Sequence, residues 1–239
     1  MQNKVEEAKK ILLGNRKDGY TLPTNNKLYP AQWNWDSAFI ALGYSYFNLD
    51  FSITEIETLL NGQWDDGMVP HILFHEKDTS YFPNHTTWQC GKNIPSSGIT
   101  QPPVLASILR KIVEKNQLSN EQHSRIVNII TKIKNYHDWF IKFRDPNKTG
   151  LVSILHPWES GYDNSPIWDQ PMSNIKVDKD LNYKRRDLEV SNSDERPLKT
   201  DYDRYVTLRD QFRDVQYDPH KMYELSLIHI SEPTRRTII

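Results

Sequence analysis

The sequence predicts an all-α protein whose functional residues lie on long aromatic loops. Apolar residues recur at helical spacing in several separate segments. The 239 residues show neither the sustained apolar/polar alternation of half-buried strands nor the strand–helix–strand rhythm of a parallel sheet. Aromatic residues make up 11% of the chain and supply bulky side chains for a core.

Two helices are expected near the N-terminus. Residues 5–13 have amphipathic spacing, and Gly14 is expected to end that helix. Asp36 is expected to cap a second helix that runs toward Phe47, because aspartate accepts hydrogen bonds from the free N–H groups of a first turn.

Three later helices are each predicted by a start signal followed by apolar residues at helical spacing. The signals are a Ser-x-x-Glu capping box at residue 52, a Pro-Pro pair at 102–103 and a Ser-x-x-Gln capping box at residue 119. The apolar residues that follow them are Ile56, Leu59 and Leu60, then Leu105, Ile108, Leu109, Ile112 and Val113, then Ile126, Ile129, Ile130, Ile133, Tyr136 and Phe140.

A last helix is expected over residues 202–215, and short strands could form over residues 69–74 and 151–155. Two long segments lack helical pattern. Residues 61–98 are rich in aromatic side chains, which argues against disorder, whereas residues 169–198 are more polar and are expected to be a mobile flap or a poorly ordered connection.

Composition limits the partners and the compartment. A net charge of −1 argues against nucleic acid or an anionic membrane as an electrostatic partner. The single cysteine, Cys90, excludes an internal disulfide and fits a reducing compartment. The charged N-terminus lacks the apolar run of a signal peptide, and no segment approaches the roughly 20 apolar residues of a membrane span. We therefore expect a soluble cytoplasmic protein, with its oligomeric state left open.

Residues 156–166 carry the strongest functional signal. Glu159 and Asp163 lie four residues apart between Trp158 and Trp168, in a stretch whose prolines and glycine prevent a regular helix. Aromatic faces stack on pyranose rings, and an apolar wall raises a carboxyl pKa toward the value that a general acid needs. The alternative is a surface turn whose tryptophans reach into the core.

Both carboxyl groups of this loop are candidates for a proton donor. Asp163 has aromatic neighbours in Trp158, Tyr162 and Trp168, whose desolvation would raise its pKa. Glu159 is the rival acid, or else a hydrogen-bonding residue that shapes the loop. Asp36, at an expected helix N-terminus, is predicted to stay charged and to accept hydrogen bonds from sugar hydroxyls, with plain N-capping as the alternative.

No metal or cofactor is expected. His71 and His75 have metal-ligand spacing only on a helix, which the neighbouring Pro70 disfavours. Residues 145–150 resemble the start of a calcium loop, but His156 stands where the twelfth-position acid is needed. A phosphate-cradling glycine loop is absent from the sequence.

Four segments, in order, resemble glycoside hydrolase family 63, and within it the bacterial mannosylglycerate and glucosylglycerate hydrolases. They are Tyr-Pro-Ala-Gln-Trp-Asn-Trp-Asp-Ser-Ala-Phe at 29–39, Gln-Trp-Asp-Asp-Gly-Met-Val-Pro-His at 63–71, Ser-Gly-Ile-Thr-Gln-Pro-Pro at 97–103, and the acidic aromatic loop at 158–166. The resemblance implies part of an (α/α)6 toroid of helical hairpins, and an enzyme that cleaves the α-glycosidic bond of a small carbohydrate with inversion.

The resemblance also implies roles for particular residues. Asp163 matches the general acid. The residues that match sugar or acceptor contacts are Tyr29, Trp33, Trp35, Asp36, Tyr81, Gln101, Trp158, Gly161, Arg196 and Tyr202. Among them, Arg196 and Tyr202 match the pair that grips the acceptor carboxylate.

Nothing in the last part of the sequence matches the family's catalytic base, a glutamate. Residues 1–224 are therefore expected to be the N-terminal part of a catalytic domain, inactive by itself, and residues 225–239 resemble a translated sequencing adapter. Two alternatives remain open: an inactive carbohydrate-binding fragment, and an oligosaccharide α-glucosidase of the same family. The sequence does not distinguish glucose from mannose.

Overall fold

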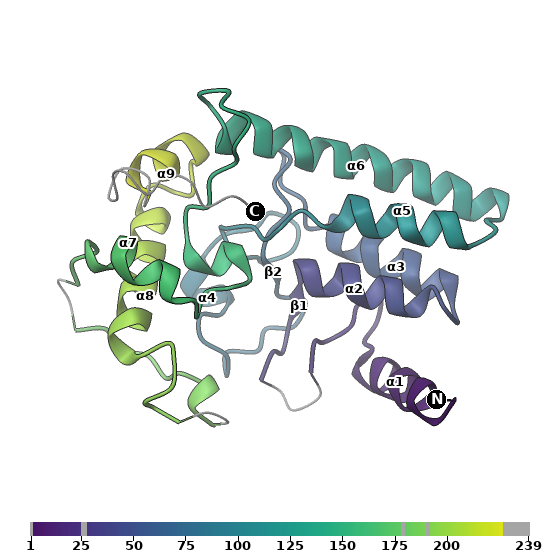
Figure 1. Ribbon diagram of the computed structural model, residues 1–239, viewed down its shortest axis with the longest axis horizontal. Helices are drawn as coiled ribbons and strands as arrows, with labels where there is room; N and C mark the ends of the chain where they lie inside the picture. Colours follow the sequence, from purple (N-terminus) through teal and green to yellow (C-terminus); the bar gives the residue numbers. More distant parts are fainter. Residues whose placement is uncertain (1, 25–27, 178–179, 190–191, 227–239) are drawn as a thin grey trace.

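The computed structural model describes residues 2–24, 28–177, 180–189 and 192–226, and most of its regular structure is helical (Figure 1). This confirms the prediction of a mainly helical protein. The longer helices are α1 (Gln2–Asn15), α2 (Asn34–Tyr44), α3 (Leu49–Leu60), α5 (Leu105–Lys115), α6 (Asn120–Arg144), α8 (Lys199–Asp214) and α9 (Pro219–Leu225). The shorter elements are α4 (His85–Trp88), α7 (Asp169–Ser173), the strands β1 (Gln32–Trp33) and β2 (Ile72–Leu73), and the 3-10 turns η1 (Pro157–Ser160), η2 (Pro166–Trp168) and η3 (Asp187–Glu189).

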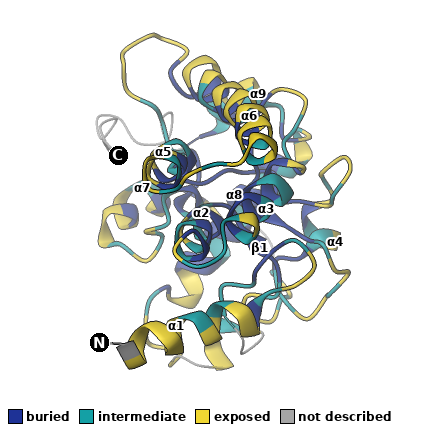
Figure 2. Cartoon of the chain, turned by 90° about the vertical axis from the view of Figure 1, so that its right-hand side faces the viewer, coloured by how far each residue is buried: buried dark blue, intermediate teal, exposed yellow. Residues whose placement is uncertain are grey.

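The buried apolar side chains form two clusters. The first lies between α2, α3, α5 and α6, and the second joins α8 and α9 to the loops that follow α3 and α6. Figure 1 shows the helices of the first cluster on the right and α7, α8 and α9 on the left, with the strands between them. Figure 2 shows that α2 and α3 bury one face, whereas α1 is mostly exposed.

Of the four expected helix start signals, two were confirmed and two were wrong. The Pro102–Pro103 pair precedes α5, which begins at Leu105 as expected. Ser119 Oγ accepts a hydrogen bond from the Gln122 N–H at 3.2 Å, and Gln122 Oε1 accepts one from the Ser119 N–H at 3.1 Å, so the expected capping box caps α6. The box expected at Ser52 does not form, because α3 begins earlier, at Leu49, where the Asn48 side chain caps it. Ser52 is buried within that helix.

The second error concerns Asp36. Helix α2 begins at Asn34, so Asp36 lies inside the first turn and is not the N-cap residue. Trp33, the last residue of strand β1, occupies the N-cap position without a capping hydrogen bond, because its indole has a donor and no acceptor. Helix α1 also continues through Gly14, where it was expected to stop, and ends at Asn15.

One of the two expected strands forms. Strand β2 lies within residues 69–74 and pairs antiparallel with β1, with Trp33 opposite Ile72. The expected strand at 151–155 is irregular backbone. A two-residue strand gives no periodic signal, so β1 was not expected. The β1–β2 pair fixes the start of α2 against His71, whose carbonyl accepts the Asn34 N–H at 3.0 Å.

Both long segments pack against the second cluster over their described residues. Trp88 of the first and Met172 and Ile175 of the second are buried. Residues 227–239, most of the segment expected to be adapter-derived, lie outside the described residues. Within the described part of the chain, no helix has the length and apolar character needed to cross a membrane.

Candidate active site

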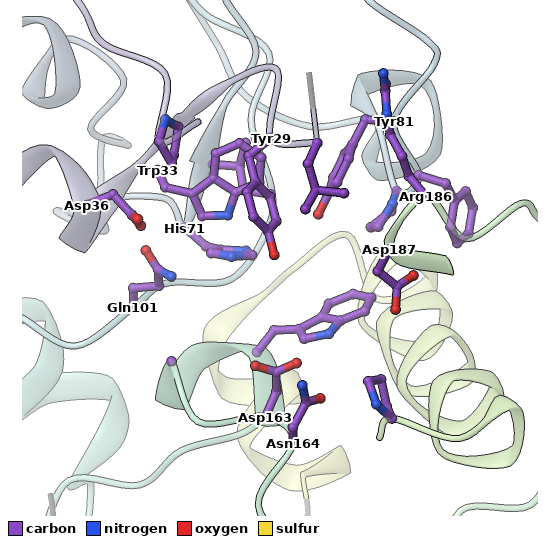
Figure 3. Close-up of a pocket in the computed structure, with 18 of the residues that line it drawn as sticks. Tyr29, Trp33, Asp36, His71, Tyr81, Gln101, Asp163, Asn164, Arg186 and Asp187 are labelled. Carbon is purple, nitrogen blue, oxygen red and sulfur yellow. The ribbon is translucent and has the colours of Figure 1, made fainter. Parts of the chain in front are cut away.

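A cavity of about 300 Å³ opens beside the second cluster, whose Trp33, Ile72 and Tyr202 line it (Figure 3). It is near the lower size limit of small-molecule sites and mixes aromatic walls with a few convergent polar groups. Of the residues to which the family resemblance gave a role, all except Arg196 line it: Tyr29, Trp33, Trp35, Asp36, Tyr81, Gln101, Trp158, Gly161, Asp163 and Tyr202. The structure therefore brings together residues from five separate parts of the sequence.

Aromatic rings form one wall of the pocket. The Trp33 ring makes edge contacts with Tyr29 and with Tyr81, at centroid distances of 5.1 and 5.6 Å. Figure 3 shows the Tyr29 and Trp33 rings above His71, at the side of the pocket that also holds Asp36 and Gln101. Edge contacts of this kind fix the orientation of the rings and leave flat faces available to a ligand.

Gly161 allows the loop of Asp163 to close on this wall. Its φ is +64°, a left-handed conformation that favours glycine, and a Cβ there would lie 2.5 Å from the Trp35 ring. Any larger side chain would push the loop away from Trp35. The glycine that matched the family motif therefore has a steric reason to be present.

Asp163 is a partly buried carboxyl group on the pocket floor. Burial raises its pKa, its own backbone N–H opposes that rise, and the negative charge of Asp187 adds to it. The Tyr205 hydroxyl donates to the Asp163 carbonyl at 2.8 Å and ties the loop to α8. The prediction that Tyr162 desolvates Asp163 is wrong, since the Tyr162 side chain is 72% exposed.

The pKa of Asp36 shifts in the direction opposite to the one expected. Burial raises its pKa from 3.8 to about 6, although hydrogen bonds from its own N–H and from the Trp35 side chain lower it. Desolvation therefore outweighs the helix N-terminus that was expected to keep this carboxyl ionised at low pH. At neutral pH it is still mostly ionised and faces Gln101 (Figure 3), which suits an acceptor of sugar hydroxyl hydrogen bonds.

Glu159, the rival acid, lies outside the pocket lining. Its side chain is 4% exposed and pairs with Arg144 at 2.6 Å. Its carboxylate also accepts the Leu155 N–H at 2.9 Å and the Thr100 N–H at 3.3 Å. This geometry favours the other hypothesis for Glu159, that of a hydrogen-bonding residue that shapes the loop.

His71 is a polar lining residue to which the sequence analysis assigned no substrate contact. Burial, with a smaller contribution from nearby His156, lowers its pKa to about 3, so the ring is neutral at physiological pH. Its buried Nδ1 has no hydrogen-bond partner among the described residues. His75 instead bonds Gln32 at 2.7 Å, and the described residues contain no cluster of three potential metal ligands. In the sequence, the sign of a substrate contact for His71 was its place at the end of the 63–71 motif.

A model of the mannosylglycerate hydrolase MGH1-like glycoside hydrolase domain matches residues 29–238. The chain belongs to this glycoside hydrolase family. It is 44% identical over 223 residues to the mannosylglycerate hydrolase of Thermus thermophilus, covering 92% of this chain and 54% of that protein. It is 34% identical over 208 residues to the glucosylglycerate hydrolase of Mycolicibacterium hassiacum, covering 82% of this chain and 47% of that protein.

A solved structure gives the same result. A family 63 mannosylglycerate hydrolase from Thermus thermophilus, crystallised with Tris and D-glycerate, superposes with a TM-score of 0.87 at 44% identity. The match covers 93% of this chain and 53% of that one. The chain thus spans about half the length of the relatives that it matches.

In this family 63 chain the pocket has a second charged end, which the sequence analysis missed. Arg186 and Asp187 line it, and Figure 3 shows Asp187 across the pocket from Asp36. Buried Arg185 holds the Asp187 carboxylate through Nε at 3.1 Å and donates through Nη1 to the Pro197 carbonyl at 2.7 Å. These residues belong to the polar segment expected to be a flap, where no periodicity marked them.

Arg196 is the candidate residue that does not line the pocket. Its Nη2 pairs with Asp169 at 2.5 Å and its Nε donates to the Asn164 carbonyl at 2.9 Å. Tyr202 does line the pocket, and its hydroxyl donates to the Phe82 carbonyl at 3.2 Å. The structure therefore does not place the expected acceptor pair on one surface. Asn164, however, is itself a lining residue, so Arg196 contacts the pocket lining without being part of it.

Proposed function

We propose that the full-length protein is an inverting α-glycoside hydrolase that acts on a glycosylglycerate such as mannosylglycerate or glucosylglycerate. The observation that carries this proposal is the place of Asp163, a carboxyl group of raised pKa in an aromatic pocket that also presents Asp36 and Gln101. The names of the 44% and 34% identical relatives support the substrate class.

In the proposed reaction, one set of pocket residues binds the sugar, and two carboxyl groups transfer protons. Asp36, Gln101 and neutral His71 hold the hydroxyls of the sugar against the aromatic wall. Asp163 donates its proton to the glycosidic oxygen as the bond to the anomeric carbon breaks. A second carboxylate removes a proton from the water that attacks the opposite face of the sugar.

That second carboxylate is proposed to come from a part of the protein outside these 239 residues. The same part would complete an (α/α)6 toroid, because the chain spans about half the length of its relatives. On this proposal the 239 residues alone bind carbohydrate without hydrolysing it.

The acceptor carboxylate is proposed to bind Arg196 and Tyr202. The Arg196–Asp169 pair is partly exposed, with 32% and 52% of the two side chains accessible. Exposed pairs of this kind contribute about 0–1 kcal/mol, so a substrate carboxylate can compete for the guanidinium at little cost. A bidentate contact to arginine would then select an anionic aglycone.

Steady-state kinetics of the full-length protein test this function. We expect hydrolysis of a glycosylglycerate to exceed that of the matching neutral glycosylglycerol. Arg196→Ala should raise KM for the glycosylglycerate by at least tenfold, the loss of about one charge-assisted contact, and leave the neutral substrate nearly unchanged.

Arg186→Ala is the matched control, since Arg186 is the cation that lines the pocket among the described residues. A selective effect of Arg186→Ala, with none from Arg196→Ala, would move the carboxylate contact to Arg186. Equal effects of both variants on charged and neutral substrates would favour the oligosaccharide α-glucosidase.

A further inference from the structure

A buried ion pair joins the loop that carries Asp163 to helix α6. Arg144 is the last residue of α6, and Glu159 lies in the 3-10 turn η1. Their side chains are 1% and 4% exposed, and Arg144 Nη2 lies 2.6 Å from Glu159 Oε1. Neither residue lines the pocket, so the pair has no contact with substrate in the proposed reaction.

The Glu159 carboxylate joins three segments. Oε1 accepts from Arg144 and from the Thr100 N–H, and Oε2 accepts from the Leu155 N–H at the base of the loop. Charge-assisted bonds of this kind are short and directional, so they fix the turn in one position.

The segment of Thr100 continues into the pocket. Gln101 follows it, and Gln101 Oε1 accepts the Trp35 N–H at 3.1 Å. The Tyr136 hydroxyl of α6 donates to the Gln101 carbonyl at 2.8 Å. Helix α6 therefore supports both the sugar-contacting segment, through Tyr136, and the proton-donating loop, through Arg144.

We propose that Glu159, held by Arg144, is a positioning residue that sets the place of the Asp163 carboxyl relative to the glycosidic oxygen. Asp163 lies four residues after Glu159 in the same loop, with Trp158 and Gly161 lining the pocket beside it. The inference rests on the proposed function, because it takes Asp163 as the acid. A displacement of about 1 Å at a reacting group can cost roughly 100-fold in rate.

The test keeps the charge and shortens the side chain. Removal of Glu159 would leave the Arg144 charge buried, and its Nε and Nη1 already have no hydrogen-bond partner among the described residues. Such a variant could unfold. Glu159→Asp in the full-length protein retains a counter-ion and withdraws the carboxylate by one methylene.

Glu57→Asp is the matched control. Glu57 pairs with Arg125 of α6 at 2.6 Å, and neither residue lines the pocket. We expect Glu159→Asp to lower kcat on a glycosylglycerate by about 10- to 100-fold with KM within about threefold. Glu57→Asp should leave kcat unchanged. Because the Arg125 and Glu57 side chains are 25% and 32% exposed, it should lower the melting temperature by less than Glu159→Asp does.

The leaving group separates positioning from general loosening. Fluoride leaves without protonation, so an α-glycosyl fluoride needs little help from an acid. If Glu159 acts through Asp163, the kcat loss of Glu159→Asp shrinks to less than about threefold on the fluoride, as it does for Asp163→Asn. An equal loss on both substrates overturns the inference and leaves the proposed function standing. If Asp163→Asn itself shows no leaving-group dependence, the proposed function and the inference both fail.

Discussion

Asp163→Asn in the full-length protein is expected to lower kcat on a glycosylglycerate by about 10²- to 10⁴-fold, the usual contribution of a general acid. Asparagine has nearly the same shape and cannot donate a proton of comparable acidity. The Asp163 backbone carbonyl, which accepts from Tyr205, stays in place. KM should therefore change little, and steady-state kinetics at matched pH measure both constants.

The pH dependence of activity provides a second test of Asp163 as the acid. The acid must be protonated to act, and burial raises the pKa of Asp163. Activity of the wild-type protein is therefore retained above the ordinary pH range of an aspartate and falls as pH rises through the raised pKa. Asp163→Asn should abolish that alkaline limb. A mild effect of Asp163→Asn, together with an effect of Glu159→Gln that is severe on the glycosylglycerate and small on the glycosyl fluoride, would reverse the assignment of the acid.

Asp36→Asn is expected to weaken catalysis and to stabilise the fold. The variant loses the charged hydrogen bonds from Asp36 to sugar hydroxyls. A hydrogen bond to a charged group contributes about 1.5–3 kcal/mol, so kcat/KM should fall by at least tenfold. Because the pKa of Asp36 rises from 3.8 to about 6 on folding, the ionised form is destabilised in the native state. Two pKa units correspond to about 3 kcal/mol, which partial exposure reduces to the order of 2 kcal/mol.

The sign follows from proton binding. Between about pH 4 and pH 6 the native state binds more protons at Asp36 than the unfolded state, so wild-type stability falls as pH rises through this window. Asp36→Asn should therefore gain stability above about pH 6 and gain none below about pH 4, as measured by urea unfolding at both ends. A loss of about 1 kcal/mol at both pH values would instead indicate that the Asp36 carboxyl stabilises the first turn of α2.

Some local signals in the sequence predicted the structure correctly, although those at Ser52 and Asp36 did not. The Ser119 capping box and the apolar face of α6 depend on residues within a few positions of each other, and both form. The acidic aromatic loop was recognisable because its residues are contiguous, and its resemblance to family 63 brought in the distant segments.

Long-range effects were not predictable in the same way. The sequence placed Asp36 at a helix start, but its pKa is set by burial under segments distant in the chain. The partner of Glu159 is Arg144, fifteen residues earlier and on another element, so no spacing rule links them. Arg186 and Asp187 meet the pocket only because the polar segment folds back over it.

The stereochemistry of the product tests the central claim most directly. Proton NMR of the full-length protein acting on an α-glycosylglycerate follows the anomeric signal of the sugar before it equilibrates in water. An acid at Asp163 acting with a distant base, and water between them, predicts that the β-anomer appears first together with free glycerate. First appearance of the α-anomer would indicate a retaining enzyme with a nucleophile beside Asp163, and would contradict the account.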